Sequence, residues 1–94
     1  MEKYIVVIEK AKNNYSAFSP DVLGCIATGA TVEETLSEMR DALQMHFEAI
    51  MDDGEDIPQP KGLAYHIANN VFKPGEIADE YFITEIEMPV QQHA

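Results

Sequence analysis

The chain has 94 residues, 46% of them apolar, which suits one compact domain with one hydrophobic core. Its 17 acidic and 6 basic residues give a formal net charge of -11, which repels phosphate backbones and excludes direct binding to nucleic acid as an expected function. The single cysteine excludes an internal disulfide, and no apolar run approaches the roughly 20 residues of a membrane span, so we expect a cytoplasmic protein.

The first 29 residues predict three short β-strands. Residues 3–9, KYIVVIE, are β-branched and apolar at their centre without alternation, which is typical of an inner strand covered on both faces. Residues 15–19, YSAFS, follow an Asn-Asn turn signal and alternate apolar with small residues, so the two segments should form a hairpin. Pro20 and Asp21 then stop the second strand, and residues 24–29, GCIATG, are predicted to form a third.

A long helix is predicted from Thr31. Residues 31–34, TVEE, have the T-x-x-E pattern of a capping box, in which the glutamate returns to the backbone N–H of the cap residue. Gly54 is suited to follow the last helical turn. An apolar stripe at steps of three or four should pack this helix on the sheet, and it comprises Val32, Leu36, Met39, Leu43, Phe47 and Ile50.

The remaining residues predict a crossover and a last strand. Prolines 58 and 60 favour an extended path, and residues 61–79 form a crossover with a possible short helix. Residues 81–88, YFITEIEM, have high β-propensity and could lie parallel beside the first strand. The expected fold class is α+β, an antiparallel, hairpin-rich sheet of about four strands (β-β-β-α-β) with one long helix packed on one face. We expect one domain over 1–94, with its core in 3–60 and 80–89.

The sequence predicts no catalytic, cofactor-binding or metal-binding residue. His46, His66 and His93 include no pair at the i, i+4 spacing that presents two ring nitrogens to one zinc ion. Cys25 has no evident base beside it and is expected to be a small buried hydrophobe. The carboxylates on or near the predicted strands are scattered, whereas a two-metal nuclease needs a close cluster; they are Glu9, Asp21, Glu85 and Glu87.

Several short segments together resemble the HicB-type antitoxin domain, over residues 3–60 and again through the last strand. Where that family usually has Pro-Asp-Leu-Pro-Gly-Cys, residues 20–25 are PDVLGC. The segments that carry the resemblance are YIVVIE at 4–9, YSAFSPD at 15–21, GCIATG at 24–29, TVEE at 31–34, His46 in the helix, and GEDIPQP at 54–60.

The resemblance implies a partial ribonuclease-H-like fold without the catalytic carboxylates. It also implies a non-catalytic function, the neutralisation of a small basic HicA-type toxin that cleaves messenger RNA, by covering the active site of the toxin. The acidic charge of the chain would steer such a basic protein toward it. Many family members add an operator-binding segment, and this sequence shows none, so direct contact with operator DNA is not expected.

The candidate partner-binding residues are Asp21, Val22 and Leu23. An apolar Val-Leu pair exposed in a loop is unfavourable in water, which favours a role in binding a partner. A tight turn with no role in binding also explains these residues. On the docking hypothesis, Asp21→Lys weakens partner binding without unfolding the domain, whereas Phe47→Asp disrupts the core.

We expect a homodimer or a larger homo-oligomer, because a sheet covered by a helix on one side leaves a strand edge or its other face exposed, and a second copy of the chain could cover it. Two alternative functions stay open at this point. One is an orphan HicB-like regulatory or ligand-binding module without a toxin. The other is a ribonuclease-H-like, metal-dependent nuclease.

Overall fold

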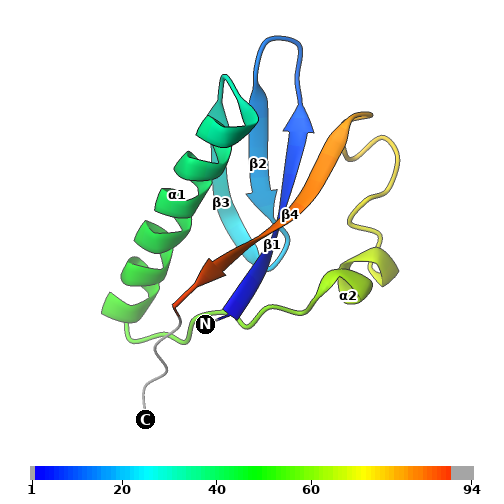
Figure 1. Ribbon diagram of the computed structural model, residues 1–94. Coiled ribbons are helices and arrows are strands. Elements are labelled where there is room, and N and C mark those ends of the chain that lie inside the picture. Colours follow the sequence, from blue (N-terminus) through cyan, green and yellow to red (C-terminus); the bar gives the residue numbers. More distant parts are fainter. Residues whose placement is uncertain (1, 90–94) are drawn as a thin grey trace.

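A computed structural model describes residues 2–89 of the chain, and it shows the α+β fold expected from the sequence (Figure 1). Four strands form one sheet, and a long helix lies along it, as predicted. In chain order the elements are β1 (Glu2–Lys10), β2 (Tyr15–Ser19), β3 (Val22–Gly29), α1 (Val32–Asp52), α2 (Leu63–Ala68) and β4 (Tyr81–Met88).

The strands are ordered β3-β2-β1-β4, and each is antiparallel to its neighbours. The inner position of β1 explains its unbroken apolar run, because residues 4–8 are buried on both faces of the sheet. The last strand does lie beside β1, but the parallel orientation considered for it was wrong. In the register observed, Glu9 is opposite Tyr81 and Glu2 is opposite Met88.

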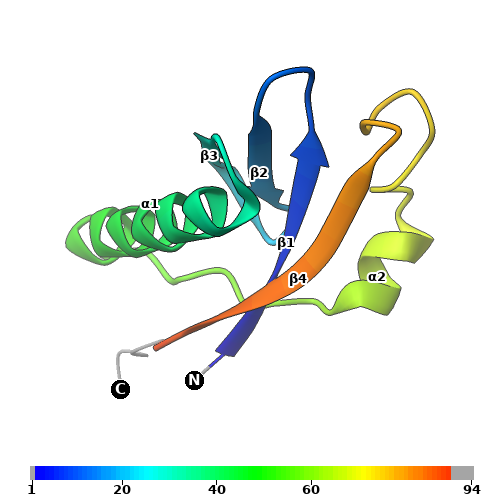
Figure 2. The same cartoon turned by 45° about the horizontal axis from the view of Figure 1, so that its top comes forward.

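The path of the crossover explains this reversed direction. After α1 the chain crosses past the lower end of the sheet in Figure 1 and forms α2 on the face opposite α1. It then runs along that face to the other end of the sheet, where it enters β4 (Figure 2). It therefore reaches β4 at the end of the sheet where β1 finishes. A hydrogen bond from the Lys10 N–H to the Glu80 carbonyl, at 2.9 Å, joins the two strands there.

Helix α1 begins at the predicted cap. The side-chain oxygen of Thr31 accepts a hydrogen bond from the Glu34 N–H at 3.0 Å. The Glu34 carboxylate accepts a hydrogen bond from the Ala30 N–H at 3.2 Å. In the expected capping box it would accept from the N–H of Thr31, so the observed bond is shifted by one residue toward the N-terminus. Gly54 follows the helix with φ 74°, and its N–H reaches the Met51 carbonyl at 2.9 Å, one of the two bonds of a Schellman motif.

The main core lies between α1 and the sheet. Of the predicted stripe, Met39, Leu43 and Phe47 are fully buried, while its remaining members are partly buried at the margins. The ring of Phe47 lies 5.1 Å from that of Tyr4 on β1, measured between centroids. The apolar stripe therefore packs on the sheet as the sequence predicts.

A second, smaller core lies on the opposite face of the sheet. Ile5 and Val7 of β1 point to this side and pack with Ile77 from the crossover, and Phe18 and Phe72 flank them. Figure 2 shows the sheet between α1 on one side and α2 with its following loop on the other. The crossover thus forms a partial third layer, which the sequence did not predict.

Candidate functional site

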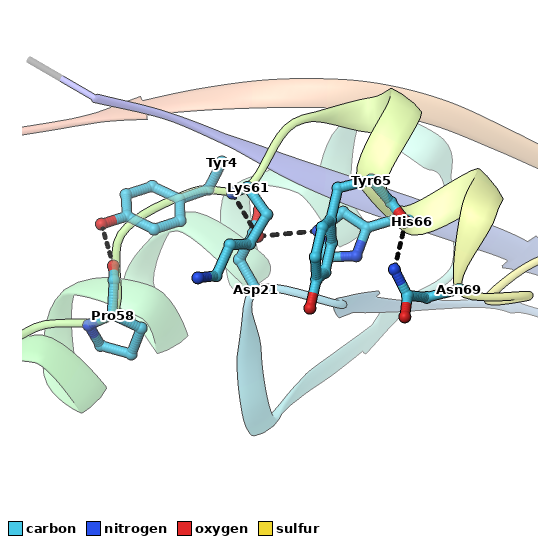
Figure 3. Close-up of polar contacts among 7 residues, drawn as sticks. All are labelled: Tyr4, Asp21, Pro58, Lys61, Tyr65, His66 and Asn69. Carbon is cyan, nitrogen blue, oxygen red and sulfur yellow. Dashed lines mark hydrogen bonds and ion pairs between the residues drawn. The ribbon is translucent and has the colours of Figure 1, made fainter.

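The turn at Pro20 and Asp21, between β2 and β3, holds a buried carboxylate (Figure 3). The side chain of Asp21 is 0% exposed. Its Oδ1 atom accepts a hydrogen bond from the backbone N–H of Lys61 at 2.9 Å and a second from Nε2 of His66 at 2.7 Å. Since a carboxylate oxygen accepts here, the hydrogen of His66 lies on Nε2. The Asp21–His66 pair therefore joins the β2–β3 turn to α2.

This pair fixes the position of α2. A six-residue helix is too short to be stable alone, so its placement depends on tertiary contacts. His66 is its one buried residue, and its ring lies under Tyr65 in an edge-on contact. Within residues 2–89 the second carboxylate oxygen of Asp21 and the hydroxyl of Ser19 are buried without a hydrogen-bond partner. Stabilisation of the desolvated Asp21 carboxylate therefore depends on His66 and Lys61.

A second contact ties the chain after α1 to the sheet. The hydroxyl of Tyr4 donates a hydrogen bond to the Pro58 carbonyl at 2.7 Å (Figure 3). Burial, and then the negative charges of Glu2 and Asp21, raise the pKa of Tyr4 to about 12. Tyr4 therefore keeps its proton, and with it this hydrogen bond, throughout the neutral pH range.

Cys25 lies in the main core, as expected for a small hydrophobe. Burial raises the pKa of its thiol, which disfavours the reactive thiolate. His46 lies half-buried on α1, and His93 lies outside the described residues. Among residues 2–89, no group of three or more His, Cys, Asp or Glu side chains is arranged to hold a metal ion. In the same part of the chain, no helix has the length and apolar character needed to cross a membrane.

The three candidate partner-binding residues have very different surroundings. Val22 is buried in the main core, Asp21 is bonded to His66, and Leu23 is 85% exposed. Their role in docking stays a prediction, and only Leu23 offers a side chain to a partner. The burial of Asp21 does change one expectation, because a lysine there would replace a desolvated carboxylate and should destabilise the domain as well as affect docking.

Exposed apolar side chains collect on the side of the sheet that carries α2. We call this surface the α2 face, and it comprises Leu63, Tyr65, Ile67, Tyr81 and Ile83. Tyr81 stacks on Phe72 with ring centroids 5.7 Å apart, and a groove of about 390 Å³ runs between α2 and β4. The groove is lined mainly by Ile67, Phe72, Tyr81 and Ile83. Exposed apolar surface of this kind is typical of an interaction site.

Carboxylates border the α2 face. Glu85 and Glu87 follow Ile83 at alternate positions of β4 and therefore project from the same side of the strand. Glu87 lies 4.0 Å from the Lys3 ammonium, and Lys73 in the groove lies 3.9 Å from the Glu76 carboxylate. Such exposed pairs contribute little to stability, so the carboxylates stay accessible to an incoming cation. An apolar centre beside acidic groups is complementary to a basic protein.

The model of a family described as HicB-like antitoxin of bacterial toxin-antitoxin system matches residues 4–89. The chain belongs to this HicB-like antitoxin family. This finding confirms the resemblance that the short segments of the sequence suggested.

Two relatives of known sequence resemble this HicB-like chain. An uncharacterised 14.9 kDa protein of Haemophilus phage HP1 is 30% identical over 70 residues, which are 74% of this chain and 53% of the phage protein. The chain thus spans about half the length of that relative. A UPF0150 protein of Helicobacter pylori is 33% identical over 72 residues, which are 77% of this chain and 90% of the relative.

Solved structures share the fold of this HicB-like chain. A chain of the HicA3 and HicB3 toxin-antitoxin complex superposes with a TM-score of 0.70 at 24% identity, over 90% of this chain and 95% of that one. The N-terminal domain of the Burkholderia pseudomallei antitoxin HicB superposes with a TM-score of 0.73 at 19% identity, over 94% and 99%. These likenesses show that the four-stranded sheet with its long helix is the fold of a HicB antitoxin domain.

Sequence reasoning missed the partnership of Asp21 with His66. The two residues are 45 positions apart, and neither belongs to a motif that indicates the other. The one signal in the sequence is a polar residue, His66, within a short segment that is otherwise mostly apolar, LAYHIA. A histidine buried in such a segment needs a hydrogen-bond partner.

Proposed function

We propose that this chain is an antitoxin that neutralises a small basic HicA-type toxin by binding it, without catalysis of its own. The observation that carries the proposal is the α2 face, an exposed apolar surface bordered by carboxylates on a chain of net charge -11. Family membership and the fold shared with a chain of the HicA3 and HicB3 complex support it. Because messenger RNA is the substrate of such a toxin, the two proteins would meet in the cytoplasm.

Two parts of the surface have separate roles in this proposal. The acidic charge raises the rate of encounter with a basic partner, an effect of about 10- to 1,000-fold that weakens as salt is added. The apolar side chains of the α2 face then set how long the complex lasts, because buried aromatic and aliphatic anchors dominate dissociation rates. Affinity should therefore depend on both salt and apolar contacts.

Leu23 is the proposed contact residue within the Asp21, Val22 and Leu23 segment. Exposure of its side chain to water is unfavourable in the isolated protein, and burial of the same side chain against a partner would stabilise the complex. Val22 anchors the start of β3 in the core, and Asp21 positions α2 through His66. Asp21 and Val22 thus act on binding by positioning the surface, while Leu23 acts by contact.

The experiment pairs the purified chain with a short basic protein of HicA type, sought first in the reading frame beside its gene. We expect co-expression to rescue growth that the basic protein arrests when expressed alone. Leu23→Asp should raise the dissociation constant at least about tenfold, which is the loss of roughly 1.4 kcal/mol of apolar contact. Ser37→Asp is the matched control, because it adds the same charge at an exposed position of α1, on the opposite side of the sheet.

Rescue by the wild-type chain and by Ser37→Asp, with loss in Leu23→Asp, supports the proposal. Failure of the wild-type chain to bind or rescue would overturn it. Cleavage of RNA by the pure chain, dependent on magnesium and abolished by a chelator, would favour the nuclease alternative instead.

A further inference from the structure

A hollow lies between α1 and the strand β3, on the side of the sheet opposite the α2 face. Its volume is about 330 Å³, and its lining from β3 includes Cys25. Met45 and His46 line it from α1. A thiol, a thioether and an imidazole therefore border the same hollow, although they come from two different elements of the fold.

Helix geometry explains why these side chains meet. Residues three and four apart lie on one side of a helix, so Met45 and His46 both lie on the side of α1 that carries Ala42. Ala42 packs against the main core, which contains Cys25. Because the alanine side chain is small, it leaves space between α1 and β3 that a larger residue would fill. Cys25 therefore borders this space from the sheet, and His46 borders it from the helix.

The three side chains are available to a ligand. Cys25 is 4% exposed and His46 is half-buried, and no side-chain hydrogen bond or ion pair of residues 2–89 involves either of them. Met45 is 70% exposed, and its unbranched side chain has three rotatable bonds, so its sulfur atom can adjust to a bound group. The hollow therefore offers two sulfur atoms and a ring nitrogen.

We propose that Cys25, Met45 and His46 bind one monovalent copper ion, Cu(I). The ligand types select this ion, because thiolate and thioether sulfur atoms are soft ligands that favour Cu(I), and imidazole also binds copper. None of the described residues that line the hollow is a carboxylate, so the oxygen ligands that suit Mg²⁺, Ca²⁺ and Mn²⁺ are missing. Structural zinc sites usually have four Cys or His ligands, and this hollow has two.

Binding exchanges a proton for the metal ion. The Cys25 thiol releases its proton to solvent as the bond between sulfur and copper forms, and copper stays in the +1 state throughout. The ion would join β3 to α1 through ligands that only the folded chain holds together, so it should stabilise the fold. The α2 face and the groove beside β4 lie across the sheet and stay open (Figure 2).

The test adds Cu(I) alone, as its acetonitrile complex and without oxygen, to the pure full-length chain in competition with the coloured chelator bicinchoninate. The wild-type chain should take one ion per chain, and its melting temperature should rise. X-ray absorption at the copper edge should show sulfur and nitrogen as the nearest atoms. Met45→Leu and His46→Gln should each raise the dissociation constant at least about tenfold. The matched control is Met51→Leu, at a methionine of the same helix outside the hollow, which should bind like the wild type.

Cys25→Ala should abolish binding, and the two variants on α1 decide the outcome if this core substitution unfolds the chain. A wild-type chain that takes no copper from the chelator would overturn the proposal. So would an affinity of Met45→Leu or of His46→Gln equal to that of Met51→Leu. An equal rise in melting temperature with Zn²⁺ would contradict the choice of a soft ion. Because no toxin is present, none of these results bears on the proposed antitoxin function.

Discussion

Removal of the Asp21 carboxylate should loosen the join between the β2–β3 turn and α2. In Asp21→Ala, the His66 ring and the Lys61 N–H both lose their acceptor, at 2.7 and 2.9 Å respectively. His66 remains buried, so it cannot recover a hydrogen bond from water without movement of α2. The substitution therefore acts on stability through groups that lie 40 and 45 positions away in the sequence.

The magnitude follows from these two contacts. Hydrogen bonds to a charged group contribute about 1.5–3 kcal/mol each, and breaking a buried pair by removing one partner costs about 3–5 kcal/mol. The substitution also removes the Oδ2 atom, which is buried without a hydrogen-bond partner, and this favourable effect offsets part of the cost. We therefore expect Asp21→Ala to lower the free energy of unfolding by about 3 kcal/mol, a large fraction of the roughly 5–15 kcal/mol typical of a domain.

The assay is urea unfolding of the two single variants, Asp21→Ala and His66→Phe, and of the double variant. The pair interaction should appear as a coupling free energy of about 1.5 kcal/mol or more. Amide hydrogen exchange should show the lost protection concentrated in α2 rather than in β1. The control is Asp56→Ala, an exposed carboxylate whose loss should change stability by less than about 0.5 kcal/mol. Single effects that add within about 0.5 kcal/mol would refute the reasoning.

Three further substitutions test the core and the contacts around it. Phe47→Asp places an unpaired charge in the main core and should cost about 4 kcal/mol or more, visible as loss of the thermal unfolding transition. Gly29→Ala should lower the melting temperature, because a Cβ atom there would lie 2.7 Å from the backbone nitrogen of Thr35. Tyr4→Phe should flatten the alkaline fall in stability. The folded-state pKa of Tyr4, about 12, exceeds the ordinary 10.0, so the unfolded state loses its proton first, and stability should fall as the pH rises from 10 toward 12.

Each of these has an outcome that contradicts it. A cooperative Phe47→Asp transition near the wild-type temperature would mean that α1 does not bury this ring. Unchanged stability of Gly29→Ala would mean that the start of α1 moves easily away from β3. An alkaline transition of equal size in Tyr4→Phe and the wild-type chain would assign the pH dependence to other groups.

Local patterns were enough to predict most elements of the fold. The β-branched run of β1, the alternation of β2 and the T-x-x-E cap of α1 each specify structure within a few residues, and each was found where expected. The direction of β4 was not predictable in this way. It depends on the crossover climbing the second face of the sheet, where Ile77 packs on Ile5 and Val7, and no local pattern specifies that contact.

The candidate site was predictable only in part. The sequence drew attention to the turn at Asp21 because proline, aspartate and glycine cluster there. It could not show that the carboxylate is buried, since this depends on His66 and on the backbone of Lys61, both supplied by the crossover. The α2 face was missed for the same reason, because it is assembled from α2 and β4 across a long separation in sequence.

The central claim, that this HicB-like chain acts by covering a toxin, is tested most directly by titrating RNA cleavage. The HicA-type toxin proposed as the partner is held at fixed concentration with messenger RNA, and the purified chain is added in steps. The account predicts that cleavage falls linearly to zero at a fixed molar ratio of the two proteins, while the chain alone leaves RNA intact with magnesium present. Undiminished cleavage at a large excess of the chain, or cleavage by the chain alone, would contradict it.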